Sequence, residues 1–183
     1  MNVGASQPSD YGLYFQWGDT QGYTADQVGI DEGQKYFGWA DYKYSNYDGT
    51  DMTKYNETDG KTVLEAADDA ARANWGGSWR MPTTDELQAL DSAVNTAWTQ
   101  VNNVYGILCA DKTDSSKTLF FPAAGYAYGG SVDGVGNEGD VWSSSLSIDS
   151  MDDAWYLYFD NLGINCDYYS IRCYGFAVRP VAD

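Results

Sequence analysis

The spacing of apolar residues changes once along this 183-residue chain, near Asn95, from helical periodicity to the alternation of short strands. Between Lys61 and Asn74, small and apolar residues recur at helical spacing, and the glycine pair that follows would end that helix. A second helix is expected to begin at Thr83, because Thr83 and Glu86 have the spacing of a capping box. The sequence therefore predicts two helices in its first half.

After Asn95 the chain has the pattern of short strands separated by turns rich in Gly, Asp and Ser. Six segments have strand spacing: Ala97 to Val101, Gly106 to Ala110, Thr118 to Pro122, Val141 to Ser145, Ala154 to Phe159 and Ala177 to Val181. Residues 1–60 predict little regular structure and long loops. Helices followed by a set of short strands are typical of an α+β fold with a mainly antiparallel sheet. The length and apolar content predict one domain, residues 1–183.

Acidic residues outnumber basic residues by 27 to 10, which gives the chain a net charge of −17. Such a surface repels polyanions, so nucleic acid and anionic membranes are disfavoured as partners. The apolar stretches are too short to span a bilayer, which excludes membrane insertion. The first 20 residues lack the basic start and apolar core of a signal peptide.

The chain contains no histidine, which excludes the commonest general base, the commonest metal ligand and every Ser-His or Cys-His arrangement. We therefore expect no catalytic residues, no bound metal and no cofactor. Cys109, Cys166 and Cys173 lack CxxC spacing, so free thiols are favoured, although a bridge between Cys166 and Cys173 stays open. The acidic loop from Asp133 to Asp140 offers oxygen ligands for a structural Ca²⁺, but such loops are more often only solvated.

From Gly139 to Asp183 the chain has no Lys, Glu or Gln, although the first 138 residues contain six, five and seven of them. Tyr, Asp, Asn and Ser take their place, and these are the residues that dominate antibody binding loops. The gap also matches a genetic history in which AAY codons were randomised at their adenines, because the resulting NNY codons encode none of the missing residues. The alternative is an ordinary acidic, tyrosine-rich β region.

Three sequence blocks occur in order: Asn74 to Thr83 (NWGGSWRMPT), Phe121 to Tyr126 (FPAAGY), and Trp142 to Ser145 (WSSS) with Val178 to Val181 (VRPV) closing the chain. In these blocks the chain resembles the C-type-lectin-fold domains related to the formylglycine-generating enzyme. It is most similar to the variable proteins of diversity-generating retroelements in gut bacteria and their phages. The resemblance covers nearly the whole chain, and it implies a C-type lectin-like fold. Relatives usually have a strand before Asn2, which implies a missing or shortened first strand here.

The blocks also have a physical interpretation of their own. Trp75, Trp79 and Trp142 are expected to anchor a core whose regular elements are short, because each buried aromatic side chain contributes a few kcal/mol. Of Arg80 and Arg179, one is expected to pair with a carboxylate.

The resemblance implies that residues 1–138 form a scaffold and that residues 139–181 form a hypervariable region diversified by adenine-directed mutagenesis. Trp142, Met151 and Trp155 cannot come from NNY codons and should be fixed. The resemblance then implies these ligand-binding positions: Asp140, Val141, Ser147, Asp149, Asp152, Asp153, Tyr156, Tyr158, Asp160, Asn165, Asp167, Tyr168, Tyr169, Ser170, Cys173, Tyr174 and Phe176. Alternation predicts that Tyr156 and Tyr158 project from one strand face while Trp155, Leu157 and Phe159 point to the core.

These expectations favour a binding protein over an enzyme. Its partner would be a protein or glycan on a bacterial cell surface, and the chain would belong to a phage tail or a bacterial surface. One alternative is a formylglycine-generating-type oxidase, but its two copper-binding cysteines are separated by four residues, whereas Cys166 and Cys173 are separated by six. The other is a calcium-dependent lectin, but here Gln7-Pro8-Ser9 is at the wrong end of the chain and Trp142 is followed by Ser143. The sequence leaves the ligand and the oligomeric state open.

Overall fold

The computed structural model describes residues 1–46, 48–49 and 51–182, and in this part the fold is mixed helix and sheet with mainly antiparallel strands. The strands form four small antiparallel sheets, β7-β8-β9, β2-β3-β4, β5-β6 and β1-β10. Their bounds are Trp79–Arg80 (β1), Val94–Val101 (β2), Val104–Asp111 (β3), Thr118–Pro122 (β4), Tyr126–Tyr128 (β5), Ser131–Asp133 (β6), Gly139–Leu146 (β7), Asp153–Asp160 (β8), Gly163–Ile171 (β9) and Val181–Ala182 (β10).

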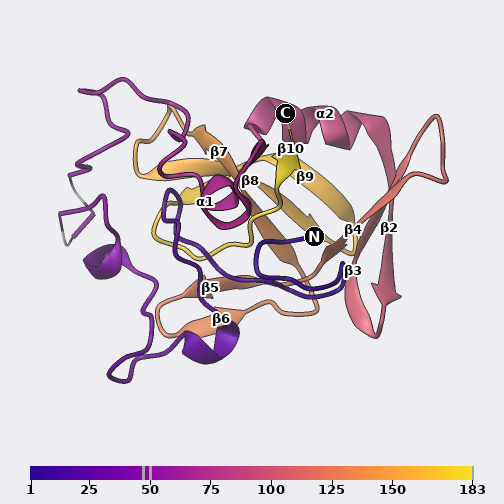
Figure 1. Ribbon diagram of the computed structural model, residues 1–183, viewed down its shortest axis with the longest axis horizontal. Coiled ribbons are helices and arrows are strands. Elements are labelled where there is room, and N and C mark those ends of the chain that lie inside the picture. The colour runs from indigo at the N-terminus through magenta and orange to yellow at the C-terminus, as the bar shows by residue number, and fades with distance from the viewer. Residues whose placement is uncertain (47, 50, 183) are drawn as a thin grey trace.

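The helices of the described part are α1 (Ala70–Trp75) and α2 (Thr84–Ala93), with two 3₁₀ turns at Ala25–Gln27 and Trp39–Asp41. In Figure 1, α2 lies across the top of the β7-β8-β9 sheet, and the β2-β3 hairpin extends at the right. The purple loops that contain the two 3₁₀ turns lie at the left and lower left of the view, away from α2. No helix among the described residues is long and apolar enough to cross a membrane.

The expected start of α2 is confirmed. Thr83 is the N-cap residue, its side chain accepts a hydrogen bond from the Glu86 backbone, and the Glu86 carboxylate accepts one from the Thr83 N–H. Such reciprocal bonds satisfy two of the free amide groups at a helix N-terminus. Arg80 binds the same carboxylate with two hydrogen bonds of 2.7 Å, so Arg80 is the arginine of the expected ion pair.

The expected helix from Lys61 to Asn74 is wrong in extent, because only its last part, in α1, is helical. The residues before α1 lie extended along β7 instead. The Leu64 N–H donates to the Ser144 carbonyl at 2.9 Å, and the Leu146 N–H donates to the Thr62 carbonyl at 2.8 Å. These bonds to a distant strand replace the local bonds of a helix. The helix begins only after Asp69, whose side chain accepts from the Arg72 N–H at its first turn.

Five of the six expected strands lie within β2, β3, β4, β7 and β8. The sixth, Ala177 to Val181, is wrong: Ala177 makes a single parallel bridge to Val141, and only Val181 continues into β10. Strands β1, β5, β6 and β9 are not among the six expected segments. Strand β9 lacks regular alternation because its register against β8 shifts between Tyr156 and Tyr158.

The two faces of the β7-β8-β9 sheet belong to different cores. Val141 and Leu157 pair across β7 and β8 and pack with Leu87 of α2 in one core. The next pair, Trp142 and Tyr156, points to the opposite face, where Trp142 packs with residues of the N-terminal segment in a second core. A third, smaller cluster gathers five buried side chains: Tyr14, Val28, Phe37, Ala124 and Ala127.

The expected tryptophan anchors are confirmed only for Trp142, which is 0% exposed. Trp75 is half-buried and Trp79 is 37% exposed, and their rings contact each other edge to face instead of entering the core. The reason is that β1 pairs only with the terminal strand β10, at the edge of the fold. The second fully buried tryptophan is Trp17, in the loop-rich N-terminal segment.

Candidate functional site

On the face of β8 and β9 that borders the second core lies a group of partly exposed tyrosine and polar side chains, which we call the tyrosine face. Tyr156 pairs with Tyr168 and Tyr158 pairs with Asn165, so the register shift on β9 brings Asn165 and Tyr168 to the same face. The Tyr168 ring centroid lies 6.3 Å from that of Tyr156 and 5.8 Å from that of Tyr158. The tyrosine face consists of Tyr156, Tyr158, Asp160, Asn165, Tyr168 and Tyr174.

Tyr174 joins this face through a buried phenylalanine. The Phe176 ring lies 4.9 Å from Tyr156 and 6.0 Å from Tyr174, and it stacks on Trp142 at 4.1 Å. Trp142 and Phe176 therefore form an apolar base beneath the tyrosine face.

The aromatic surface continues beyond the region that the sequence singled out. Tyr174 stacks on Tyr126 at 5.9 Å and contacts Tyr128 at 4.4 Å, and both partners belong to β5. Sequence reasoning missed these two tyrosines because they precede Gly139. Their alternation around Ala127 within the FPAAGYAY segment was the available signal.

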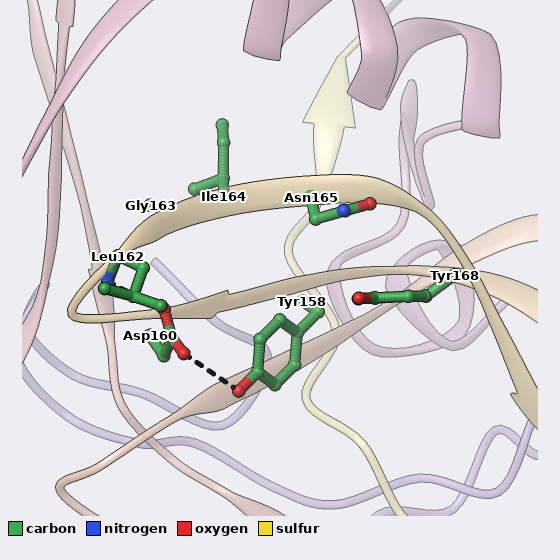
Figure 2. A pocket seen from close by; sticks show the side chains of 7 residues that line it. All are labelled: Tyr158, Asp160, Leu162, Gly163, Ile164, Asn165 and Tyr168. Atoms are coloured by element: carbon green, nitrogen blue, oxygen red, sulfur yellow. Dashed lines mark hydrogen bonds between the residues drawn. The ribbon is translucent and has the colours of Figure 1, made fainter.

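A hollow of about 240 Å³ opens where β8 turns into β9. Figure 2 shows Tyr158 and Asp160 on one side of it, Asn165 on the other, and the hydroxyl end of Tyr168 directed toward the Tyr158 ring. Its lining is Tyr158, Asp160, Leu162, Gly163, Ile164, Asn165 and Tyr168. Leu162 is 91% exposed at the tip of this turn, so an apolar side chain is available beside the polar groups.

A second hollow of about 560 Å³ adjoins the first and shares Tyr158 and Asp160 with it. Its far wall is the β2-β3 hairpin, where Trp98 and Tyr105 stack with ring centroids 6.1 Å apart. The rest of its lining is Gly136, Asn137, Glu138 and Asn161. No pattern in the sequence indicates this wall, since Trp98 and Tyr105 are distant along the chain from Tyr158.

Two carboxylates compete for the hydroxyl group of Tyr158. Its oxygen lies 3.2 Å from Glu138 Oε2 and 3.2 Å from Asp160 Oδ2. Burial raises the pKa of Tyr158, and the negative charges of Asp160 and Glu138 raise it further, so the hydroxyl keeps its proton at neutral pH. A tyrosine hydroxyl has one proton to donate. Only one of the two carboxylates can therefore be satisfied by it at a time.

Asp140, on β7, is the cross-strand partner of Tyr158 on β8. Its side chain is 4% exposed, and its Oδ2 atom has no hydrogen-bond partner among the residues that the structure describes. Burial raises the pKa of Asp140 to about 8, and the nearby charge of Glu138 adds to this shift. The group was expected at a ligand-binding position, but it lies beneath the surface and is mainly protonated at neutral pH.

Four more expected positions are buried and are not accessible to a ligand in this structure: Val141, Ser147, Cys173 and Phe176. Val141 and Phe176 belong to the two cores, because the alternation of β7 and the packing of Phe176 on Trp142 turn them inward. The Cys173 carbonyl accepts a hydrogen bond of 3.0 Å from the buried Gln16 side chain.

All three cysteines are buried free thiols, so the bridge between Cys166 and Cys173 is not formed. Cys166 belongs to the core beneath α2, whereas Cys173 contacts the N-terminal segment. Burial raises the pKa of Cys166 and of Cys173 to about 12, which disfavours the thiolate form that binds metals.

Asp167 and Tyr169 lie on the opposite side of β9 from Tyr168. Asp167 accepts a hydrogen bond of 2.9 Å from Gln88 of α2, and the Tyr169 ring contacts Trp155 edge to face at 5.3 Å. Tyr169 and Tyr168 are 47% and 48% exposed, but neighbouring residues of a strand point to opposite faces. The two tyrosines therefore belong to different surfaces.

The remaining expected positions lie at the other end of the strands: Asp149, Asp152, Asp153 and Ser170. Asp153 begins β8 and Asp160 ends it, a separation of roughly 20 Å along an extended strand. The structure thus brings six of the seventeen expected positions together on the tyrosine face.

No family model, no curated protein and no solved structure matches this chain. Among the described residues, no group of three or more acidic or cysteine side chains is arranged to hold a metal ion.

Proposed function

We propose that this chain is a binding protein with a C-type lectin-like scaffold, whose tyrosine face is diversified by a retroelement to recognise varying protein or glycan ligands. It would act on a phage tail or at a bacterial surface. The observation that carries the proposal is the tyrosine face itself, in which six positions with NNY-compatible residues meet beside two adjoining hollows. Tyrosine side chains offer large, rigid contact area at low entropic cost, and clustered aromatic residues are common anchors of binding interfaces.

The contrast between neighbouring residues supports this proposal. Tyr156 and Tyr158 are both half-buried, and Tyr156 packs against the second core, whereas Leu157 between them is 0% exposed. Trp142 is fully buried and packs beneath Tyr156. Tyr168 is the exposed member of the six positions, and changes at exposed sites usually alter stability by about 0.5 kcal/mol or less.

The two alternatives have less support. An oxidase of the formylglycine-generating type needs paired thiolates, but the Cys166 and Cys173 thiols lie in different packing environments and have raised pKa values. A calcium-dependent lectin needs clustered oxygen ligands, and the acidic loop from Asp133 to Asp140 directs Glu138 to the Tyr158 hydroxyl and buries Asp140. A binding surface that uses neither thiolate nor metal fits these observations better.

The origin of the surface can be checked in the neighbouring DNA. We expect a reverse-transcriptase gene beside a near-copy of the codons for residues 139–181, with differences confined to adenines. The differing codons should include those of the tyrosine face and leave Trp142 and Trp155 unchanged. Differences spread over all codon positions would contradict a retroelement origin.

The binding role can be checked with two matched display libraries of this chain, each randomised at six positions. The first library varies the tyrosine face, and the second varies the remaining accessible positions, Asp149, Asp152, Asp153, Asp167, Tyr169 and Ser170. After selection against the same purified bacterial surface protein, we expect specific binders to be enriched only in the first library. The positions of the first library share one surface, whereas those of the second are divided between two places.

Surface expression of both libraries controls for folding and should be similar. Equal enrichment of binders from the two libraries would show that the tyrosine face has no special role.

A further inference from the structure

We propose that the two hollows around Tyr158 bind an arginine or lysine side chain of a protein partner. The proposal rests on the binding function proposed above and names the chemistry that this particular tyrosine face recognises. It depends on three features of the hollows: an excess of acceptors over donors, an uncompensated negative charge, and aromatic walls.

The first feature is a shortage of hydrogen-bond donors. Glu138 Oε2 and Asp160 Oδ2 each lie 3.2 Å from the Tyr158 oxygen, so they are no more than twice that distance apart. The hydroxyl supplies one proton for two carboxylates. A guanidinium group carries five N–H donors in a planar fork, and an ammonium group carries three. The Leu162 N–H donates to the other oxygen of Asp160 at 2.7 Å, but among the described residues Glu138 Oε2 and Asp160 Oδ2 share the Tyr158 hydroxyl as their side-chain donor. Either group would supply further donors.

The second feature is an uncompensated negative charge. Neither hollow is lined by a lysine or arginine, and neither Glu138 nor Asp160 forms an ion pair with any residue that the structure describes. By contrast, the acidic side chains of Asp68 and Glu86 elsewhere in the fold are held by Lys54 and Arg80. A cation bound between Glu138 and Asp160 would relieve the repulsion between them.

Asp140 lies beside this place, although it lines neither hollow. It is a carboxyl group buried to 4% exposure, on the same face as Tyr158, with Oδ2 unpartnered among the described residues. A buried polar atom without a partner is costly, and native proteins keep few of them. A cation in the adjoining hollow would favour the ionised form of Asp140 through its charge.

The third feature is the aromatic lining. Tyr158 and Tyr168 meet at an interplanar angle of 77° at one hollow, and Trp98 and Tyr105 stack at 13° at the other. Cations are attracted to the faces of such rings, and guanidinium groups also stack on them. The chain uses this chemistry in its own core, where the Arg172 guanidinium lies 5.5 Å from the rings of both Trp17 and Tyr42.

Part of this site lies outside the proposed variable region. Glu138 and Trp98 precede Gly139, and neither residue can be encoded by an NNY codon. A preference for positive charge would therefore be built into the scaffold, while Tyr158, Asp160 and Tyr168 would adjust it in each variant.

The test is a nuclear magnetic resonance titration of the full ¹⁵N-labelled chain with N-acetyl-arginine methylamide, and separately with its neutral isostere, N-acetyl-citrulline methylamide. We expect the arginine compound to shift the Trp98 indole signal and the backbone signals of residues 136–138 and 158–165, with an affinity that falls as salt is added. The citrulline compound should cause no comparable shifts. Equal shifts by both compounds would overturn the proposal, and so would arginine-induced shifts scattered over the whole acidic surface.

Three single variants locate the site. Glu138→Gln and Asp160→Asn should each raise the Kd of the arginine compound about tenfold, the factor expected for the loss of one charge-assisted hydrogen bond. Asp167→Asn removes one negative charge from the opposite side of β9 and should change the Kd less than twofold if the effect is local. A similar loss in all three variants would mean that only net charge matters, and would contradict the proposed site.

A titration with a methyl glycoside tests the chemical class of the ligand separately from the proposed binding function. If the glycoside shifts the Tyr158 and Trp98 signals and the arginine compound does not, the cation proposal is wrong and the tyrosine face is a glycan site. If the two display libraries fail to differ, the binding function itself is wrong. The two failures are therefore distinguishable.

Discussion

Replacing Trp142 with alanine should lower the free energy of unfolding by about 4 kcal/mol, because the change removes a fully buried tryptophan from a packed core. The Trp142 ring stacks on Phe176 at 4.1 Å, and its Nε1–H donates to the Phe15 carbonyl at 2.8 Å. The substitution leaves a cavity beneath the tyrosine face and removes one of the two donors to the Phe15 carbonyl, which keeps the Phe176 N–H at 3.1 Å. Urea denaturation followed by circular dichroism measures the loss.

The matched control is Trp79→Ala, which removes the same side chain from a site that is 37% exposed. We expect a loss of about 1 kcal/mol there, since a partly solvated residue leaves no enclosed cavity. Equal losses in the two variants would contradict the assignment of Trp142 as the base of the tyrosine face. A Trp142→Phe variant should keep part of the stability, because it restores the ring but not the Nε1–H donor.

Replacing Asp140 with asparagine should stabilise the folded chain at pH 7 by about 2 to 4 kcal/mol, the second large effect that we expect. Burial, helped by the charge of Glu138, raises the folded-state pKa of Asp140 from 3.8 to about 8. The folded chain therefore holds this proton more tightly than the unfolded chain does. The stability that the protonated group contributes is fully present below pH 3.8 and is lost progressively as the pH rises to about 8. Asparagine has no proton to lose and avoids this decline.

The measurement is the difference in free energy of unfolding between the wild-type chain and Asp140→Asn at several pH values. The difference should be small near pH 4, grow up to about pH 8, and stay constant above that value. Comparing the two chains removes the contribution of other groups, such as Asp68, whose pKa is lowered by Lys54, Tyr44 and Tyr55 in opposition to its burial. A difference that does not change with pH would contradict the buried, proton-holding state of Asp140.

The two effects have opposite signs for one structural reason. Trp142 and Asp140 lie two residues apart on the same face of β7, beneath the tyrosine face. The Trp142 side chain packs against apolar neighbours in the second core. The Asp140 carboxyl group, by contrast, lacks a hydrogen-bond partner for Oδ2 among the described residues. Titratable groups with strongly shifted pKa values cluster at functional sites. The cost of Asp140 in the unbound chain is therefore consistent with the cation site proposed here.

Local signals in the sequence predicted the local parts of the fold. The capping box at Thr83 and Glu86 predicted the start of α2 correctly, because the whole signal lies within four residues and depends on backbone groups of the same turn. The alternation in β8 placed Leu157 and Phe159 in the core for the same reason. Trp155, which the same alternation directs to the core, is only half-buried and contacts the exposed Tyr169 ring. The helix expected from Lys61 failed because the chain near Val63 bonds to β7, more than 80 residues away.

The composition alone determined what this surface is made of: abundant tyrosine and aspartate, no histidine, and a strong excess of negative charge. Only the tertiary structure decided which of these side chains share a surface. The register shift in β9 separates Tyr168 from Tyr169, and the covering layers bury Asp140 and Phe176 while they leave Tyr158 at the edge of two hollows. Strand register and burial depend on contacts between distant segments, and the spacing of residues along one segment does not contain that information.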